Sequence, residues 1–591
     1  MKKQFYKIIA QCTLALIIYA HTNQQHALEI GAPPTPVHIC QERRGFKQIL
    51  EGRKTTLFSG ADVNNSSTTM LTIAKPGLYI LNDNMTLNPT NNNSTGILIN
   101  SDSVILDLNS FQITQDPASI ANTLTAIRIA SGKQNITIRN GSIRTINGTG
   151  VAMSSSGYIE MFNLGITGCT LYGLDLRSIN TLSINNITCS YCDGSHASAT
   201  TGACALYMFE CSNFFIENSE FSYNKSYNYV KNATGIFMEG CSWGTVQNCS
   251  ASQNSGQNAY GFRLKDSTQT TPVAYTISAK GISFDCCIAQ GNEAVYLSPN
   301  QHLAGDAFGF YLKGGYGNVF YRCDSLLNAT LSTHNKSVYG FYVDGGRDNE
   351  FVECRAQKQD ATLTGTYSSL GSSKGGQAYG FFTKDGKGNK YRSCLSEANC
   401  SSTGLGGQTT TNAIAAGFAF VNTEQASVIE ASTAIRNNGG KGSGYGIMIG
   451  HPDNVTYPNT PTQCVIRSNS LLVNQGVTKQ YGIKDFAVPT TSMFLQNLSF
   501  GHGKVNPPGG ATMSDTGKMN FYVSFSGLSG RAMDKLISEQ NSSAMGTLTA
   551  ADTPMNYSVF DSSSGSGQEG GGAGANSARQ RSLKRPGSNH A

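Results

Sequence analysis

The chain has 591 residues, of which 65 are glycine, and only 14% are charged, against a usual share of about 25%. Its hydrophobic content of 39% can support a large core, which excludes a disordered chain. The formal net charge of +6 comes from Lys2, Lys3 and Lys7 and from residues 562–591, which carry four Lys or Arg and Glu569. Residues 28–561 are therefore formally neutral, and we expect no nucleic-acid partner.

Residues 1–27 have the features of a secretory signal peptide. Lys2, Lys3 and Lys7 give a positive start, an apolar run covers 8–20, and small residues follow at Ala20 and Ala27. No later segment is apolar for 18 residues, so we expect no transmembrane segment after signal cleavage. The expected location is secreted, extracellular or in the cell envelope. Residues 28–69 are expected to form an N-terminal segment and cap.

A repeat organises residues 70–504. A small residue, usually glycine, begins a hydrophobic strand; a cysteine follows fourteen positions later, and an asparagine or glutamine five positions after that. Four copies keep this spacing: Gly235–Cys249–Asn254, Gly309–Cys323–Asn328, Gly340–Cys354–Gln359 and Gly380–Cys394–Asn399. Cys287 and Asn292 keep its second half after an insertion. A fixed unit with polar insertions of variable length indicates a solenoid, in which each turn packs only on its neighbours.

The repeat units are short strands with period-two alternation, as in Phe310-Tyr311-Leu312-Lys313, and convincing helical patterns are absent between them. Turns built only from strands predict an all-β fold, a parallel β-helix with terminal caps. Residues 505–561 lack the repeat and are expected to form a C-terminal cap or appendage. Residues 562–591 are low-complexity and basic, which predicts a disordered tail.

The segments VILDLNSFQI (104–113) and NITIRNGSI (135–143) carry a family resemblance. Together with the repeat, they make the chain resemble the right-handed parallel β-helix proteins of the pectin-lyase-like superfamily, of the bacterial secreted type. The resemblance covers roughly 70–500 and implies a single-stranded right-handed parallel β-helix. It implies no particular activity, because the superfamily includes lyases, hydrolases, epimerases, adhesins and inert spikes.

The repeated cysteines have three interpretations. Adjacent coils are about 4.8 Å apart, so equivalent cysteines should stack as small apolar side chains inside the helix. The same spacing would allow disulfides between coils in an oxidising compartment. Cys189 and Cys192, with His196, Cys204 and Cys211 nearby in sequence, suggest zinc more weakly, because a second tight Cys-x-x-Cys pair is missing.

No catalytic residues can be assigned. The resemblance to pectin-degrading hydrolases fails at their motifs: Gly501-His502-Gly503 is present, but an Asp-Asp pair is missing and Arg263-Leu264-Lys265 precedes the histidine. The lyase members use calcium-binding aspartates with a basic residue, and several aspartates here follow a strand with lysines close by. These are Asp266, Asp344, Asp348 and Asp385, with Lys265, Lys313 and Lys384. Turn-capping by aspartate explains the same pattern, so we expect no cofactor or metal, with calcium left open.

The alternation also predicts a stripe on the outer surface. If Phe262, Phe310, Phe341 and Phe381 point inward, then an equivalent outward position lies one residue later in each coil. It is occupied by Tyr207, Phe237, Arg263, Tyr311, Tyr342 and Phe382, and two residues further on lie Lys265, Lys313 and Lys384. Aromatic rings suit sugar faces and lysines suit acidic sugars, so these nine residues are glycan-binding candidates. The alternative is that the rings only stack on one another and stabilise the sheet.

The sequence therefore favours a secreted or cell-surface β-helix protein without catalysis, which binds a glycan or another surface along its long face. One alternative is a polysaccharide lyase or glycoside hydrolase that acts on an acidic polysaccharide. A second is a structural spike or adhesin stalk. The expected partners are a polysaccharide or a host or cell-surface molecule, and the exposed stripe would also permit self-association.

Overall fold

The computed structural model of the chain divides into two compact units, Met1–Ser526 and Gly527–Ala591, and the residues described here all belong to the first. They are 55–500 and 521–523, apart from gaps at 120–122, 196–201, 227–230, 270–274, 296–304, 331–335, 362–375, 402–412, 424–426, 441, 453–463, 473, 475–478, 487–491 and 496. The predicted signal peptide, most of the N-terminal cap and the basic tail lie outside them. Within these ranges, no helix is long and apolar enough to cross a membrane.

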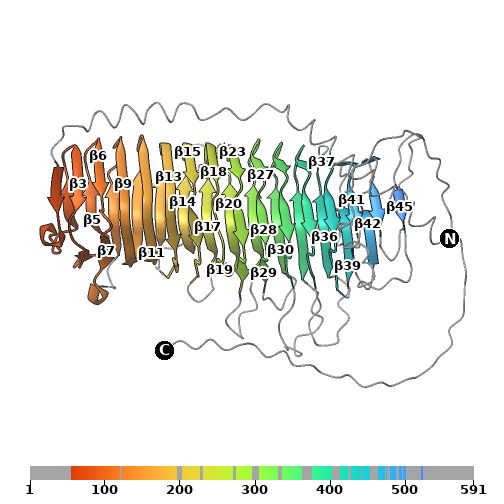
Figure 1. The fold of residues 1–591 in the computed structure, drawn as a ribbon, viewed down its shortest axis with the longest axis horizontal. Coiled ribbons are helices and arrows are strands. Elements are labelled where there is room, and N and C mark those ends of the chain that lie inside the picture. The colour runs from red at the N-terminus through yellow and green to blue at the C-terminus, as the bar shows by residue number, and fades with distance from the viewer. Residues whose placement is uncertain are drawn as a thin grey trace, which may run out of the picture. The chain divides into compact units, whose positions relative to one another are not determined.

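The described residues form a stack of coils, and strands of successive coils pair in parallel to make long sheets, as Figure 1 shows. Their helical elements are two short 3-10 helices, η2 (Gly60–Asp62) and η3 (Pro117–Ser119). One sheet takes a single strand from each coil: β2 (Thr69–Ile73), β5 (Ser94–Ile99), β8 (Leu124–Ile129), β10 (Gly148–Ser154), β12 (Tyr172–Arg177), β14 (Ala203–Phe209), β17 (Ala233–Glu239), β20 (Ala259–Lys265), β26 (Ala307–Lys313), β30 (Ser337–Asp344), β33 (Gln377–Lys384), β36 (Ile414–Val421), β39 (Ser443–Ile449) and β42 (Lys479–Asp485). We call it the long-strand sheet.

A second sheet runs along the same coils. Its strands are β1 (Thr55–Phe58), β3 (Gly77–Leu81), β4 (Met85–Leu87), β6 (Val104–Asp107), β7 (Gln112–Gln115), β9 (Ile136–Ile146), β11 (Ile159–Cys169), β13 (Asn180–Ser190), β15 (Ser212–Glu217), β16 (Glu220–Ser222), β18 (Ser242–Gln247), β23 (Lys280–Asp285), β27 (Val319–Tyr321), β31 (Glu350–Val352), β34 (Lys390–Arg392), β37 (Ser427–Glu430), β40 (Cys464–Arg467) and β43 (Met493–Leu495). All of its pairings are parallel, which is what a solenoid of strands requires.

The remaining strands complete the coils. A third parallel sheet contains β24 (Ile288–Gln290), β28 (Asp324–Leu326), β32 (Arg355–Gln357), β35 (Leu395–Glu397), β38 (Thr433–Ile435), β41 (Ser470–Leu472), β44 (Leu498–Phe500) and β45 (Phe521–Val523). Three two-residue strands pair beside it: β19 (Ser255–Gly256), β25 (Glu293–Ala294) and β29 (Ala329–Thr330). An antiparallel hairpin, β21 (Ser267–Gln269) and β22 (Tyr275–Ile277), extends from one coil.

The expected all-β parallel β-helix is therefore confirmed. Its pairing extends beyond the expected limits of 70 and 504 at both ends. At the N-terminal end β1 already pairs in parallel with β3, and at the C-terminal end β45 pairs with β44. Parallel pairing needs only free backbone groups at a sheet edge, so a segment that lacks the sequence repeat can still add a strand.

Inside the helix, aromatic rings stack directly on their equivalents in the next coil. Phe262, Phe310, Phe341 and Phe381 are all buried, as the alternation predicted, and their ring centroids are 4.7–4.8 Å apart with interplanar angles of 2–4°. A second interior column starts at Phe284 and stacks with the same spacing. The two columns meet edge to face, so each ring is packed on several sides.

The glycine that begins each repeat is required by close packing. A Cβ atom on Gly309 would lie 2.0 Å from the Ser325 Oγ and 2.7 Å from the carbonyl oxygen of Gly340. A Cβ atom on Gly340 would lie 2.7 Å from the Cβ of Ala356 in the same way. The position faces inward from the long strand, and only glycine lets the two walls approach this closely.

The asparagine of the repeat forms a buried amide ladder. Asn254 donates from Nδ2 to the Asn292 Oδ1 at 2.8 Å, and Asn292 donates to Asn328 at 2.9 Å. Each amide oxygen also accepts the backbone N–H of the residue before it in the ladder. Gln359 takes its place in the same series and accepts from Asn328 at 3.0 Å. These residues are fully buried, so the ladder satisfies polar groups that water cannot reach.

The repeated cysteines form a column of free thiols. Cys249, Cys287, Cys323, Cys354 and Cys394 are buried, and none of them is in a disulfide. Each thiol lies against a carbonyl of the preceding coil, for example Cys323 at 3.5 Å from the Phe284 oxygen and Cys354 at 3.2 Å from that of Phe320. Stacked small side chains are therefore the arrangement found, and the expected alternative of disulfides between coils is not.

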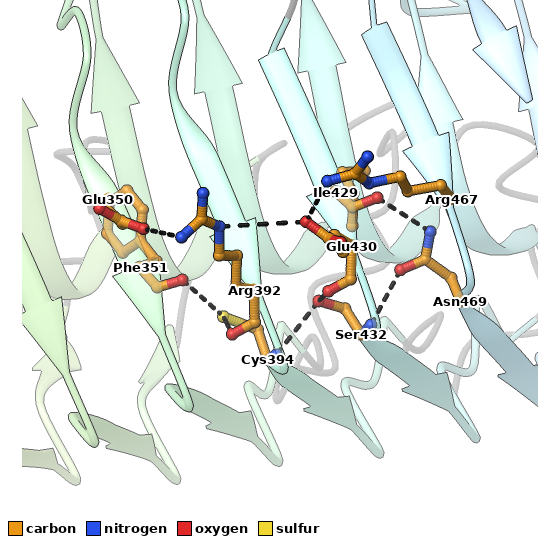
Figure 2. A network of polar contacts seen from close by, with 9 residues as sticks. All are labelled: Glu350, Phe351, Arg392, Cys394, Ile429, Glu430, Ser432, Arg467 and Asn469. Atoms are coloured by element: carbon orange, nitrogen blue, oxygen red, sulfur yellow. Dashed lines mark hydrogen bonds and ion pairs between the residues drawn. The ribbon is translucent and has the colours of Figure 1, made fainter. Parts of the chain in front are cut away.

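Charged residues extend the same stacking to the outer surface of the second sheet. Figure 2 shows Arg392 between Glu350 of the preceding coil and Glu430 of the next, with the ion pairs measuring 2.9 and 4.0 Å. Arg467 continues the series by contacting Glu430 at 2.7 Å. Such partly exposed pairs contribute at most about 1 kcal/mol each, so they support the register more than they create it.

The amide ladder predicts a position-dependent cost of substitution. Asn292→Ala should lower the free energy of unfolding by at least about 2 kcal/mol, because buried donors on Asn254 lose their acceptor. Asn100→Ala removes an exposed amide and should change it by less than about 0.5 kcal/mol. Urea unfolding followed by circular dichroism measures both. Equal effects of the two substitutions would contradict the ladder's role.

The thiol column predicts selective labelling. Burial raises the pKa of the Cys249, Cys287, Cys323 and Cys354 thiols and also that of Cys286 and Cys400, but only the last two are partly exposed to a reagent. Iodoacetamide at neutral pH should therefore modify Cys286 and Cys400 first and reach the column only on unfolding. Peptide mass spectrometry locates the modified residues. Early modification of Cys323 in the folded protein would contradict the packing described here.

Candidate functional site

The six residues predicted to form an outer stripe lie in one column of the long-strand sheet. Tyr207 pairs in register with Phe237, which pairs with Arg263, and the series continues coil by coil through the remaining three. The column is Tyr207, Phe237, Arg263, Tyr311, Tyr342 and Phe382. The structure therefore confirms that strand alternation placed these side chains at equivalent positions.

A second aromatic column lies beside the first. It consists of the residues just before the repeat glycine, which are Tyr260, Phe308, Tyr339 and Tyr379 in successive coils. Tyr260 and Phe308 stack at 4.9 Å and 2°, and Phe308 meets Tyr311 of the first column edge to face at 4.9 Å and 70°. From Tyr260 onward the rings of the two columns form a cluster separate from the interior core, and Tyr207 and Phe237 belong to another small cluster. The outer surface of this sheet is thus a layer of interlocked rings.

This packing corrects the expectation that the whole stripe is exposed. Tyr207, Phe237 and Phe382 are only 7%, 3% and 1% exposed. Phe382 illustrates the cause, because its ring packs 4.8 Å from Tyr379 and 5.3 Å from Tyr342. These three candidates therefore act mainly as packing residues.

Tyr311 and Tyr342 are the rings of the first column that retain partial exposure. They stack on each other at 5.3 Å with an interplanar angle of 2°, which holds both rings in a fixed orientation. Burial raises the pKa of the Tyr311 hydroxyl, so it stays protonated and can donate a hydrogen bond at any physiological pH. Together they form a small, rigid and partly exposed aromatic surface.

Arg263 takes the place of a ring in the same column. Its guanidinium lies 4.3 Å from the centre of the Phe237 ring and 4.8 Å from that of Tyr260. A planar cation can stack on aromatic faces at these distances, so Arg263 fills the gap between the rings of adjacent coils. Its predicted role in ligand binding thus competes with a packing role.

The predicted lysines also share one column, at the end of the long strands. Lys265 pairs in register with Lys313, which is followed by Asp344 and Lys384. Lys265 forms an ion pair of 2.8 Å with Glu239, and Lys384 lies 3.7 Å from Asp385. Lys313 is exposed. Burial raises the pKa of the Asp344 carboxyl, and the charges of Lys384 and Lys313 oppose that rise.

The aspartates weighed as part of a lyase site are not gathered into one. Asp266 accepts the backbone N–H of Ala279 at 2.8 Å across the base of the hairpin of β21 and β22, and burial raises its pKa. Within the described ranges, no group of three or more His, Cys, Asp and Glu side chains is arranged to hold a metal ion. For the zinc interpretation, Cys189 and Cys192 are described and buried, whereas His196 lies outside the described residues.

An open groove of about 530 Å³ lies where the second and third sheets meet. Its walls include Asn186, Asn218, Asn248 and Cys286, all with φ between 50° and 52°. The repeat spacing alone did not reveal this groove, although the residue before each repeat cysteine marks its position. Asn186 donates to Asn163 at 2.8 Å and Asn248 to Asn218 at 3.4 Å, so the amides bond along the column and have a structural explanation.

Comparisons with known proteins find distant structural similarity. No protein-family model matches the chain, and no curated protein sequence matches it. Among solved structures, ORF18 of Geobacillus virus E2 is 12% identical, with 59% of this chain and 57% of that one covered and a TM-score of 0.28. The catalytic domain of a GH87 alpha-1,3-glucanase in complex with tetrasaccharides is 13% identical, with 70% and 63% covered and a TM-score of 0.39.

A third similar structure is the Dettilon tailspike protein, which is 12% identical, with 60% of this chain and 62% of that chain covered and a TM-score of 0.32. The chain thus spans 57–63% of the length of these three proteins. At such identities, the parallel β-helix of this chain rests on its own strand pairing, and its chemistry has to be argued from its own residues.

The Arg263 contacts predict that the planar shape of this side chain contributes more to the stability of the fold than its charge does. Arg263→Lys keeps the charge but loses the planar group between Phe237 and Tyr260, so it should destabilise the protein by about 1 kcal/mol. Arg263→Ala should cost somewhat more, because the side-chain stem is also lost. Thermal unfolding measures both. Full stability of the lysine variant would show that the stacking contributes nothing.

Proposed function

We propose that this protein is a secreted or cell-surface β-helix that binds an acidic polysaccharide along the outer face of its long-strand sheet, without catalysing a reaction on it. The observation that carries the proposal is the stacked, partly exposed pair of Tyr311 and Tyr342 beside the exposed Lys313. The predicted signal peptide over 1–27 supports the location.

The spacing along the face suits a polymer of sugars. Equivalent side chains recur once per coil, about 4.8 Å apart in a parallel sheet, which is close to the length of one sugar unit. Flat rings present an apolar surface to the faces of sugar rings, and Lys313 presents a positive charge at the edge of the same surface. A polymer lying along the stack would meet the same kind of contact at each coil.

The lysine column favours an acidic over a neutral sugar. Lys265, Lys313 and Lys384 lie in one register, two residues past the first aromatic column toward the strand ends. Carboxylates already partner Lys265 and Lys384, so Lys313 is the cation best placed to receive an acidic group from a ligand. This arrangement provides recognition but no converging pair of carboxylates for hydrolysis.

Removing the ring pair tests the proposal. Tyr311→Ala combined with Tyr342→Ala should weaken the affinity for polygalacturonate about tenfold or more, because the flat contact surface is lost. Affinity electrophoresis in gels that contain the polysaccharide gives the dissociation constants.

Two other tyrosines provide a matched control. Tyr191 and Tyr223 are 60% and 42% exposed, stack at 5.5 Å and lie outside the aromatic columns. Because both have positive φ, the control is Tyr191→Asn with Tyr223→Asn, and asparagine tolerates that conformation. The control should bind as the unaltered protein does. Unchanged binding by the Tyr311 and Tyr342 variant would favour a structural stalk.

A further inference from the structure

A strip of alternating aromatic and basic residues follows a corner of the helix, where the long-strand sheet turns into the second sheet. Lys280, Tyr316, Arg347 and Lys387 are joined by parallel bridges, one residue per coil. Trp243 lies at the start of this series, because its neighbour Ser242 pairs in register with Lys280. We call Trp243, Lys280, Tyr316, Arg347 and Lys387 the corner strip. It is separate from the outer face of the long-strand sheet.

Trp243 is the only tryptophan of the chain, and it is 58% exposed. Its backbone has a φ of 55°, and its ring covers Gly281 of the next coil, where an added Cβ would lie 2.6 Å from the indole Cε3. The missing side chain at Gly281 therefore leaves room for the ring to lie against the backbone. The ring is held by its surroundings while one side stays open, which lowers the cost of ordering it on binding.

The basic groups of the corner strip are placed against its rings. The Lys280 Nζ lies 5.7 Å from the centre of the Trp243 ring and 5.8 Å from that of Tyr316. The Arg347 guanidinium, one coil further on, lies 4.8 Å from the centre of the Tyr316 ring. Rings and cations thus alternate along the coil axis, and the cation–π contacts hold the charged groups beside the ring faces.

The five residues of the corner strip include three cations, Lys280, Arg347 and Lys387, and no carboxylate. Of the carboxylates near the strip, Asp266 accepts a backbone N–H at 2.8 Å and is acted on by the charge of Arg347, and Asp348 follows Arg347 in sequence. The cations are spread over successive coils instead of being gathered at one point, which suits a repeating anion better than a single small one.

From these observations we propose that the corner strip is a second binding site, which takes an anionic polysaccharide of the uronate type. Sugar rings would lie against Trp243 and Tyr316, and their carboxylates would pair with Lys280 and Arg347. The proposal does not depend on Tyr311 and Tyr342, since it uses other residues on another part of the coil. A chain bound there would run parallel to one bound on the long-strand sheet.

The single tryptophan provides a local probe for the experiment. Polygalacturonate is titrated into the purified full chain at low ionic strength, and Trp243 emission is followed. We expect a saturable change in emission that is absent with dextran, a neutral polymer, and that is reversed by about 0.5 M salt. The absence of any saturable change, or an equal change with dextran, would overturn the proposal.

Two variants separate the corner strip from other causes. Lys280→Met with Arg347→Met should weaken the midpoint of the emission change about tenfold. Lys75→Met with Arg144→Met removes the same charge at exposed positions elsewhere and should leave the midpoint unchanged. If both double substitutions weakened the midpoint equally, net charge would explain the effect, and the proposed site would be wrong.

A last comparison keeps this proposal apart from the proposed function. In the variant with Tyr311→Ala and Tyr342→Ala, the Trp243 emission change should persist with the same midpoint. Its loss there would assign the signal to the long-strand sheet and overturn the corner strip. Its persistence together with unchanged overall affinity would leave the corner strip standing and contradict the role of the tyrosine pair. Circular dichroism confirms that each variant is folded.

Discussion

Coil-to-coil register is the constraint on which the rest of the structure depends. Parallel pairing places each side chain directly beside its equivalent in the next coil, so a residue type that packs well once packs well along the whole stack. Three kinds of side chain follow this rule. Rings stack (Phe310 on Phe341), amides hydrogen-bond (Asn292 to Asn328) and thiols lie next to each other (Cys323 and Cys354). Each column also needs its neighbours, because a ring, an amide or a thiol in the wrong coil would face an unlike partner.

The same rule shapes the surface. Outer aromatics stack as efficiently as inner ones, and two adjacent columns cover each other, so most of the rings that point outward are withdrawn from solvent. The accessible rings lie where a column is interrupted or where a ring lies over a glycine of the next coil. Tyr311 and Tyr342 are the first kind of place, beside the cationic rung of Arg263, and Trp243 over Gly281 is the second. Recognition is therefore expected at the irregular positions of a regular stack.

Sequence spacing predicted the fold and the alignment of the candidate residues, because both follow from a repeat that can be counted. It placed Tyr207 through Phe382 in one column and Cys249 through Cys394 in another, as the structure has them. It could not predict how exposed each outward ring is. Alternation tells on which side of the strand a side chain lies, but not which side chains lie beside it. Tyr260 lies three residues before Arg263, and Phe308 lies three residues before Tyr311. Both rings pack against Tyr311 and decide how much of it is covered. The corner strip was missed for a related reason: its residues lie in the first two positions of a strand or at isolated bridges, where no run of alternating residues marks them.

The central claim is that the helix presents a polysaccharide-binding face and performs no chemistry on the polymer. The most direct measurement is a prolonged incubation of the purified protein with polygalacturonate, with and without calcium. Bound polymer, reducing ends and the ultraviolet absorbance of unsaturated products are then recorded together. We expect the protein to retain the polymer, with no increase in reducing ends or in ultraviolet absorbance. An increase in either signal that is proportional to protein concentration would contradict it, and would direct attention to Lys313 and Asp344.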